Sequence, residues 1–588
     1  MSQYTPATLI ERRRDQMFPV LNPKQIAVAR GFGGEPRRFQ SAEIVFELGQ
    51  LGAPAYLVLS GSIKVAKRDL LGHTSSITTH GVGELTGEVS QLAGGPSLAQ
   101  GRAGAQGAEA APFDSAQLRT LVVSTAEIGE TIMRAFILRR VFLIESGAGL
   151  VLLGKGTAPD TIHLQNFLRR NGVPYTLLDP EEKSDAAHLI ERLGITKAEL
   201  PLAVCPDGTV LRSPRERALA RCLGLLPRFL ADRSYDVAVV GAGPAGLATA
   251  VYAASEGLSV LVLDARAFGG QAGASARIEN YLGFPTGISG EALAGRAYTQ
   301  AQKFGAVMAI PAEVRLLKSG LDREHADKLG FELDLDEGAP VHASAVVIGS
   351  GARYRKLDLP NVSSFEGRGV YYWASDIEAK LCARREVVVV GGGNSAGQGT
   401  VYLASEVAKV HLLVRGRSLS EGMSQYLVDR IKVLPNAKVY TETELTQLIG
   451  DTNEGLQAVC WRERANSKEE RHEIRHVFMF IGAAPNTDWL RRCAVAVDDK
   501  GFVVTGEPPD RRTATHAGGE RAALSLETTL HGVFAVGDVR AGSVKRVSAA
   551  VGEGAAVAPQ LHAYLRELTA GPPRDSTGPA SRLLTPSN

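Results

Sequence analysis

Two glycine-rich turns, each entered from a β-branched run and followed by helix-forming residues, constrain this chain more than any other feature. The first turn is Gly241-Ala242-Gly243-Pro244-Ala245-Gly246, and the second is Gly391-Gly392-Gly393-Asn394-Ser395-Ala396. A strand, a turn of this pattern and a helix form a Rossmann-like unit, in which the helix N-terminus faces the pyrophosphate of a dinucleotide. Two such units predict two Rossmann-like three-layer domains and two bound dinucleotides.

The first unit carries a complete fingerprint. Gly241 permits the tight turn, Gly243 lets the backbone approach a pyrophosphate, and Gly246 lets the helix pack on the strand. The next predicted strand, residues 259–263, ends at Asp264. A carboxylate at this distance from the turn is expected to bond the ribose of an adenosine.

The second unit differs where the first has its acid. Its next predicted strand, residues 410–414, ends in Arg415-Gly416-Arg417. An acid would repel a 2′-phosphate, whereas an arginine pairs with it bidentately, so NADPH is favoured over NADH. The alternative is that Arg415 and Arg417 are solvated surface charges. Alanine at position 396, the third glycine position, is compatible with the fingerprint.

Beyond the two turns, about residues 234–568 resemble low-molecular-weight thioredoxin reductases. The motifs that carry this resemblance are Gly269-Gly270-Gln271 and the segments 278–285, 349–352, 481–482, 485–487 and 532–538. The resemblance implies a discontinuous FAD-binding domain, residues 233–353 and 483–570, interrupted by an NAD(P)H-binding domain, residues 354–482. It also implies that the two domains rotate relative to each other and that the protein is a homodimer.

The same resemblance assigns positions around the flavin. It implies that Asp538 holds the ribityl chain, that Gln271 and Asn280 lie near the isoalloxazine, and that Lys545-Arg546-Val547 closes over the ring. The expected FAD contacts are Gly241, Gly243, Pro244, Ala245, Gly246, Asp264, Gly270, Gln271, Asn280, Gly537, Asp538, Arg546 and Val547. The expected NAD(P)H contacts are Gly391, Gly393, Asn394, Ser395, Ala396, Arg415 and Arg417. No metal site is predicted.

The redox dithiol of that family is missing. The aligned segment reads Trp373-Ala374-Ser375-Asp376, and tryptophan and aspartate form no disulfide. The five cysteines, none of them in a Cys-x-x-Cys pair, are Cys205, Cys222, Cys382, Cys460 and Cys493. Cys382 is interpreted as a small buried residue, with a functional thiol as the alternative. We therefore assign no catalytic acid, base or nucleophile, and expect an electron acceptor other than an internal dithiol.

Residues 147–232 resemble a thioredoxin or glutaredoxin module. Strands are expected at 149–154 and 174–179, a helix at 161–170 and a hairpin near 206–210, with Pro201 as the candidate cis-proline. The position of the redox motif, near residues 157–161, has no cysteine, and we treat the module as cysteine-free. It is interpreted as a docking or spacer element to which an acceptor protein could bind.

Residues 1–146 contain short alternating apolar runs that predict a small antiparallel β-roll. With a closing helix at 130–140, this segment resembles a cyclic-nucleotide-binding domain, and the resemblance places Gly87-Glu88 at the ribose and cyclic phosphate. Pro96 is followed by Ser97 in place of the phosphate-pairing arginine, a loss of about 1.5–3 kcal/mol. We expect a degenerate pocket, and Arg102 is the alternative phosphate partner.

Composition indicates a multidomain protein of 588 residues that is 44% hydrophobic, with a formal charge of +2. Neither the charge nor a helix-turn-helix points to nucleic acid. The start lacks a signal-peptide core and no window reaches the ~18 apolar residues of a membrane span, so a cytoplasmic location is expected. Three segments rich in Gly, Ala and Pro are predicted to be a loop, an insertion and a disordered tail: residues 93–111, 508–521 and 571–588.

Three functions stay open at this point. The favoured one is an FAD-dependent NADPH oxidoreductase whose acceptor is a quinone, oxygen, a one-electron carrier or a protein. The second is a redox sensor or regulatory scaffold without turnover. The third is a thioredoxin reductase that uses a dithiol outside the chain.

Overall fold

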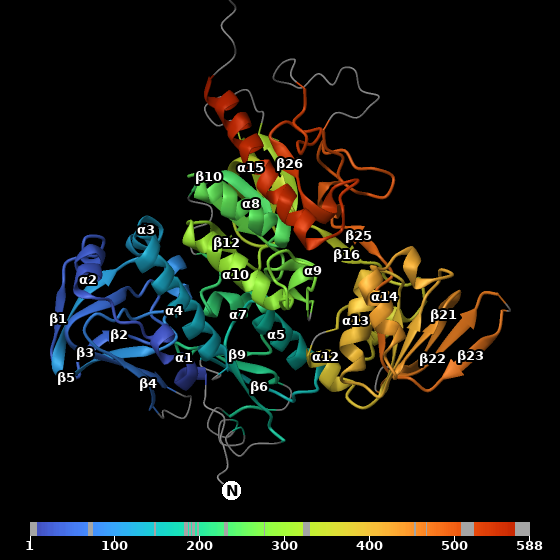
Figure 1. The fold of residues 1–588 in the computed structure, drawn as a ribbon, viewed down its shortest axis with the longest axis horizontal. Coiled ribbons are helices and arrows are strands. Elements are labelled where there is room, and N and C mark those ends of the chain that lie inside the picture. The colour runs from blue at the N-terminus through green and yellow to red at the C-terminus, as the bar shows by residue number, and fades with distance from the viewer. Residues whose placement is uncertain are drawn as a thin grey trace, which may run out of the picture.

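The computed structural model describes residues 9–68, 74–145, 149–181, 186, 190, 194–196, 199–227, 233–275, 277–320, 330–374, 376–451, 454–465, 467–506 and 522–570. These residues form four packed bodies (Figure 1). An N-terminal β-roll lies on the left, and a smaller module, residues 149–227, lies at the lower centre. The first Rossmann sheet stands above the module, and the second lies on the right. The predicted tail and the predicted insertion at 508–521 fall outside the described residues.

The β-roll is an antiparallel sheet in the order β1-β5-β3-β4, with β2 paired to β5. Its strands are β1 (Arg37–Phe39), β2 (Ile44–Phe46), β3 (Ala55–Arg68), β4 (Thr74–His80) and β5 (Gln100–Phe113). Its helices are α1 (Leu9–Met17), α2 (Pro23–Arg30), η1 (Val89–Ala93), α3 (Ser115–Ser124) and α4 (Ala126–Glu145). The predicted closing helix is the middle of α4, which is longer at both ends.

The prediction of a loop at residues 93–111 is wrong, because most of that segment lies in β5, which pairs with β3 along its length. Its small residues face large ones across the roll. A Cβ on Gly101 would lie 2.4 Å from the ring of Phe46, and Ala110 is completely buried. The Gly and Ala content therefore reflects close packing under aromatic rings rather than irregular backbone.

The module is a four-stranded sheet in the order β7-β6-β8-β9, with β6 parallel to β7 and antiparallel to β8. Its elements are β6 (Leu150–Leu153), α5 (Pro159–Arg170), β7 (Tyr175–Leu178), β8 (Leu202–Val204), β9 (Val210–Arg212) and α7 (Glu216–Cys222). The Leu200–Pro201 bond is cis, which confirms the prediction for Pro201. The predicted strands, helix and hairpin are all present.

The description of the module as cysteine-free is wrong, because residues 147–232 contain Cys205 and Cys222. These two cysteines form a disulfide with a Cα–Cα distance of 6.2 Å. The disulfide joins the turn after β8 to the end of α7. The two cysteines are 17 residues apart, so only the folding of the β8–β9 hairpin and α7 brings them together. The remaining three cysteines, Cys382, Cys460 and Cys493, are free thiols.

The first Rossmann sheet has the order β12-β11-β10-β15-β14-β13, and β26 pairs in parallel with β15. Its strands are β10 (Ser234–Val240), β11 (Val260–Leu263), β12 (Val307–Ala309), β13 (Val314–Gly320), β14 (Gly330–Leu335), β15 (Val341–Ile348) and β26 (Val533–Ala535). Its helices are α8 (Pro244–Ser255), α9 (Gly270–Gly273), α10 (Gly290–Lys303), η6 (Gly537–Val539) and α15 (Val547–Ala570). Because β26 follows the whole second sheet in the sequence but pairs in the first, this unit is discontinuous in sequence.

The second Rossmann sheet has the order β17-β24-β18-β19-β20, with the three-stranded sheet β21-β22-β23 beside it. Its strands are β17 (Val370–Tyr371), β18 (Glu386–Val390), β19 (Lys409–Leu413), β20 (Ala437–Tyr440), β21 (Thr443–Asp451), β22 (Gly455–Glu463), β23 (Glu469–His472) and β24 (Val477–Met479). Its helices are α11 (Val362–Phe365), α12 (Asp376–Leu381), α13 (Asn394–Ala404), η4 (Leu419–Glu421) and α14 (Gln425–Lys432).

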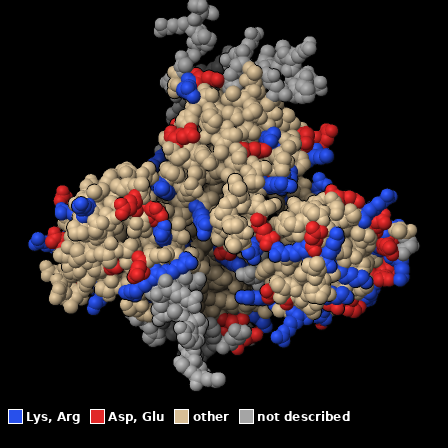
Figure 2. Space-filling model, in the orientation of Figure 1, with Lys and Arg blue, Asp and Glu red and all other residues tan. Residues whose placement is uncertain are grey.

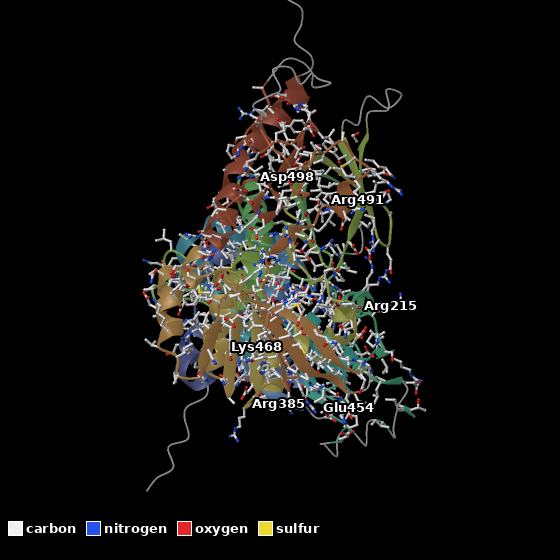
Figure 3. The ribbon with its side chains drawn as sticks, turned by 90° about the vertical axis from the view of Figure 1, so that its right-hand side faces the viewer. Arg215, Arg385, Glu454, Lys468, Arg491 and Asp498 are labelled. Carbon is white, nitrogen blue, oxygen red and sulfur yellow. A yellow bond between two sulfur atoms is a disulfide. The ribbon has the colours of Figure 1, made fainter. Side chains whose placement is uncertain are left out.

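The chain enters and leaves the second sheet through one antiparallel pair, β16 (Ala352–Tyr354) and β25 (Ala483–Pro485), followed by η5 (Asp488–Leu490). In the side view, Arg385 and Lys468 mark the second sheet, and Arg491 and Asp498 mark the returning segment above it (Figure 3). A single narrow connection of this kind suits the predicted rotation of one unit against the other.

Acidic and basic side chains are interspersed over the face drawn in Figure 2. Ion pairs also join the module to the first Rossmann sheet. Arg217 pairs with Asp336 at 2.7 Å, Arg221 with Glu337 at 2.8 Å, and Arg266 with Glu216 at 2.9 Å. Among the described residues, none of the helices combines the length and the apolar character needed to cross a membrane.

The disulfide predicts how many thiols the protein exposes before and after reduction. In denaturant without reductant, a thiol titration should detect three cysteines, and after reduction it should detect five. Replacing Cys205 and Cys222 by alanine should lower the free energy of unfolding by about 2–4 kcal/mol, because the unfolded chain loses a cross-link. Reductant should lower the melting temperature of the wild type and leave that of the double variant unchanged. Five titratable thiols without reductant would refute the pairing.

Candidate functional site

The first glycine turn joins β10 to α8, and its three glycines face different surroundings. Gly241 has a φ of +114°, and a Cβ on it would lie 2.2 Å from the carbonyl oxygen of Gly349. A Cβ on Gly246 would lie 1.8 Å from the carbonyl oxygen of Gly241. By contrast, the nearest atom to a Cβ on Gly243 is 3.8 Å away, in Gly270. Gly241 and Gly246 are therefore needed for packing, and Gly243 leaves open space at the N-terminus of α8.

Asp264 follows β11 and is held by three backbone amides. Its Oδ2 accepts from the amide of Ala242 at 2.9 Å. Its Oδ1 accepts from the amides of Arg266 and Ala267 at 2.9 and 3.1 Å. The carboxylate is thus oriented beside the glycine turn, where the sequence predicts a ribose.

A cavity of about 680 Å³ opens in front of this turn. The predicted FAD residues that line it are Gly243, Pro244, Ala245, Asp264, Gly270, Gln271, Asn280, Asp538, Arg546 and Val547. Three other predicted FAD residues do not line this cavity. Gly241 and Gly246 lie behind its wall. The amide of Gly537 donates to Glu553 at 2.7 Å. The cavity volume falls within the range of small-molecule sites.

The residues at the flavin end are held by local contacts. The Gln271 amide donates to the carbonyl of Ala352, and Lys545 Nζ donates to the carbonyl of Asp538 at 2.7 Å. Burial raises the pKa of the Asp538 carboxyl. With an open turn, an oriented acid and a cavity of sufficient size, the residues present fit an FAD molecule.

The second glycine turn joins β18 to α13 and repeats this geometry. A Cβ on Gly391 would lie 2.3 Å from the carbonyl oxygen of Phe480, whereas the nearest atom to a Cβ on Gly393 is 3.9 Å away. Ala396 is buried. Asn394 accepts from the amide of Ser424 at 2.7 Å. Asn394 and Ser395 also line the main cavity, so the two predicted nucleotide sites open toward the same space.

Arg415 and Arg417 lie beyond the end of β19 with exposed side chains. Arg417 is 3.7 Å from Glu442 and is 87% exposed. An exposed ion pair of this length contributes little to stability. The exposed side chains of both arginines can therefore meet an anion, as the sequence predicts for a 2′-phosphate.

Trp373 stands in the main cavity, where the sequence aligns the missing dithiol. Its indole N–H donates to the buried carboxylate of Glu378 at 3.0 Å. Trp373 also lines a neighbouring cavity of about 290 Å³ between α5 and α10. Asp376 begins α12. An aromatic ring thus lines the main cavity where the resemblance expects a dithiol.

Cys382 is completely buried, and burial raises the pKa of its thiol to about 12. The thiolate is the reactive form of cysteine, so this thiol stays protonated at neutral pH. The interpretation of Cys382 as a small buried residue is the one that this geometry supports.

In the β-roll, Glu88 is 5% exposed and caps η1, accepting from the amide of Ser90 at 3.1 Å. Its Oε2 lies 3.5 Å from Arg140 Nη1. Ser97 is buried, and its hydroxyl donates to the carbonyl of Ala99 at 2.8 Å. Arg102 is exposed and donates to Gln100 and to the carbonyl of Ala42 at 3.0 and 3.2 Å. The predicted substitute for the phosphate-pairing arginine is therefore engaged elsewhere.

Sequence reasoning missed the contribution of the module to the main cavity. Ile162, Asn166 and Arg170, all on α5, line it together with the predicted FAD residues. No local motif marks these three positions. Arg170 reads as an ordinary basic residue at a helix C-terminus, and only the docking of α5 reveals its neighbours.

Two family models match this chain, and relatives of known name are similar to it. Residues 235–554 match the family described as pyridine nucleotide-disulphide oxidoreductase, and residues 36–124 match the cyclic nucleotide-binding domain. The thioredoxin reductase of Treponema pallidum is 31% identical, over 57% of this chain and 99% of that protein. An alkyl hydroperoxide reductase protein of Pseudomonas putida is 32% identical, over 55% of this chain and 57% of its own length.

The chain therefore spans about three fifths of the alkyl hydroperoxide reductase proteins that it matches, and nearly all of the thioredoxin reductases. Among solved structures, the thioredoxin reductase of T. acidophilum is 29% identical with a TM-score of 0.49. That similarity covers 56% of this chain and 98% of that one.

The first glycine turn allows a paired test. In Gly243→Ala the new methyl group points into the cavity, so the apoprotein should melt as the wild type does. Its FAD affinity should fall by about ten- to a hundredfold through loss of a charge-assisted contact. In Gly246→Ala the methyl group meets backbone, which should cost about 1–3 kcal/mol of stability or more. Calorimetry and FAD titration separate the two, and unchanged FAD binding in Gly243→Ala would contradict this placement of the diphosphate.

Proposed function

The chain belongs to the pyridine nucleotide-disulphide oxidoreductase family, and we propose that it is an FAD-dependent NADPH oxidoreductase whose electron acceptor is not a dithiol of its own. One observation carries this proposal. Two glycine turns with open central positions face a shared cavity, and Trp373 occupies the place of the dithiol in that cavity.

If both cofactors were bound, they would supply the hydride-transfer and electron-transfer chemistry of the reaction. The chain itself binds and orients. The N-terminus of α8 and the open backbone at Gly243 hold the FAD diphosphate. Asp264, fixed by three amides, orients the ribose. Gly393, Asn394 and Ser395 hold NADPH on the opposite side of the cavity, and Arg415 and Arg417 select its 2′-phosphate.

The acceptor is expected to be a small oxidant, such as a quinone or oxygen, or a one-electron carrier. Cys382 is buried and protonated, and the Cys205–Cys222 pair belongs to the module. A partner protein docked at the cis-proline of the module would meet a face that already packs on the first Rossmann sheet. There Pro201 shares a groove with the ion pair of Arg217 and Asp336. An acceptor protein that docked on the module would therefore need a surface away from this groove.

A second candidate, a sensor that reports flavin state without turnover, is favoured by the contacts of the β-roll. Arg140 bridges Glu88 and the module, donating to the carbonyl of Gly172 at 2.8 Å. Gly172 lies two residues from Arg170, which lines the main cavity. A ligand that bound Glu88 would compete for Arg140. This competition would change the contact of Arg140 with the module and, through the module, the flavin site.

The first test is anaerobic mixing of the FAD-loaded protein with NADPH, followed by stopped-flow absorbance. Flavin bleaching should be faster than steady-state NADPH oxidation with the best acceptor of a panel of quinones, oxygen and one-electron carriers. Disulfide reduction with thioredoxin should be absent. Bleaching over minutes with either nucleotide, and turnover with none of the acceptors, would count against the enzyme and for the sensor.

Nucleotide preference gives a separate prediction. Arg415→Ala and Arg417→Ala should each raise the KM for NADPH by about ten- to a hundredfold, because a charge-assisted contact to the 2′-phosphate is lost. The KM for NADH, which lacks that phosphate, should stay constant. Arg471→Ala removes an exposed arginine paired with Glu473 in the same unit and serves as the control. Equal effects on both nucleotides would show that the arginines do not read the phosphate.

A further inference from the structure

Arg170, the last residue of α5, extends from the module into the wall of the main cavity. Its Nη2 donates to the carbonyl of Gly270 at 3.0 Å. Gly270 is also the nearest neighbour of the open position at Gly243, since a Cβ there would lie 3.8 Å from the Gly270 Cα. The guanidinium therefore lies beside the turn that is expected to hold a diphosphate.

The Nε of Arg170 is buried and has no hydrogen-bond partner within the described part of the chain. A buried N–H on a charged group is normally paired, because leaving it unpaired costs the desolvation of that group. The guanidinium thus has its Nη2 paired with protein and a buried Nε without a partner, while the side chain as a whole lines the main cavity.

The charges around Arg170 do not supply the missing partner. Burial lowers the pKa of Arg170 first, and the neighbouring cation of Arg266 lowers it further, while Asp264 and Glu216 raise it. Both carboxylates are already occupied. Asp264 accepts three backbone amides, and Glu216 pairs with Arg266 and lies 3.1 Å from His163. Two cations thus border a space that has room for an anion.

We propose that Arg170 binds the diphosphate of FAD, so that α5 of the module forms an additional wall of the flavin site. Arginine suits this task because its planar fork pairs with two phosphate oxygens at once. The inference rests on the proposed function insofar as that function requires FAD in the main cavity. It assigns the module a role in cofactor retention that needs no redox cysteines.

The docking of the module holds Arg170 in place. On one side, Arg169 pairs with Glu291 at 3.3 Å. On the other, the Asn171 amide donates to the carbonyl of Arg266 at 3.1 Å. Both neighbours of Arg170 therefore bind the first Rossmann unit, and Arg170 between them points to the cavity.

The test is a titration of the full-length apoprotein with FAD, read by quenching of flavin fluorescence. Arg170→Ala should weaken FAD binding by about ten- to a hundredfold, and Arg170→Lys, which keeps the charge but loses the fork, should weaken it less. The matched control is Arg169→Ala, which loosens the same docking surface without reaching the main cavity. It should bind FAD within about threefold of the wild type.

Arg170→Met, an uncharged side chain of similar length, repeats the test should Arg170→Ala fold poorly, and the melting curve of each apoprotein is compared first. FAD affinities within about threefold of the wild type for both Arg170→Ala and Arg170→Met would overturn the inference. So would an Arg169→Ala variant as weak as Arg170→Ala, because the effect would then come from docking alone. If the wild type itself bound no FAD, the proposed function would fail with it, whereas normal binding by the Arg170 variants leaves that function standing.

Discussion

The close contact between α8 and β10 at Gly246 is the constraint on which the rest of the structure depends. With hydrogen as its side chain, Gly246 lets the helix approach until its N-terminus stands directly over the glycine turn. That approach aims the first amides of α8 into the cavity and brings Asp264 beside Ala242. The Asp264 carboxylate is oriented by three backbone amides, so the geometry of this turn follows from contacts within the protein.

The chain keeps both glycine turns of this scaffold and has a tryptophan where the resemblance expects a dithiol. Trp373 fills the position of the dithiol, and its indole is fixed by Glu378 rather than left mobile. A tryptophan can pack on a planar ring but takes up no electron pair as a disulfide does. The module also lines this cavity through α5, and its arginine pairs hold it on the first Rossmann sheet.

Contacts between the bodies connect the N-terminal half of the chain to the main cavity. Arg140 connects the β-roll to the module, and the module connects to the flavin cavity through Arg170. Each link is a charge-assisted hydrogen bond to a carbonyl, so each depends on the precise seating of helices α4 and α5. Such a series of contacts offers a physical route by which the β-roll and the flavin site affect each other.

Local patterns were sufficient for the two glycine turns, Asp264, the position of Trp373 and the cis-proline at 201, because each depends on residues close in sequence. Residues 100–113 were misjudged, since a strand of small residues is stable only under Phe46 and its neighbours across the roll. The Cys205–Cys222 pair was missed because a hairpin and a helix must fold before the thiols meet. The sequence alone thus determined where the two glycine turns and the predicted cofactor positions lie, through short-range backbone geometry. Only the tertiary structure decided that Arg170 reaches the main cavity and Arg140 reaches the module, because these contacts arise from packing between separate bodies.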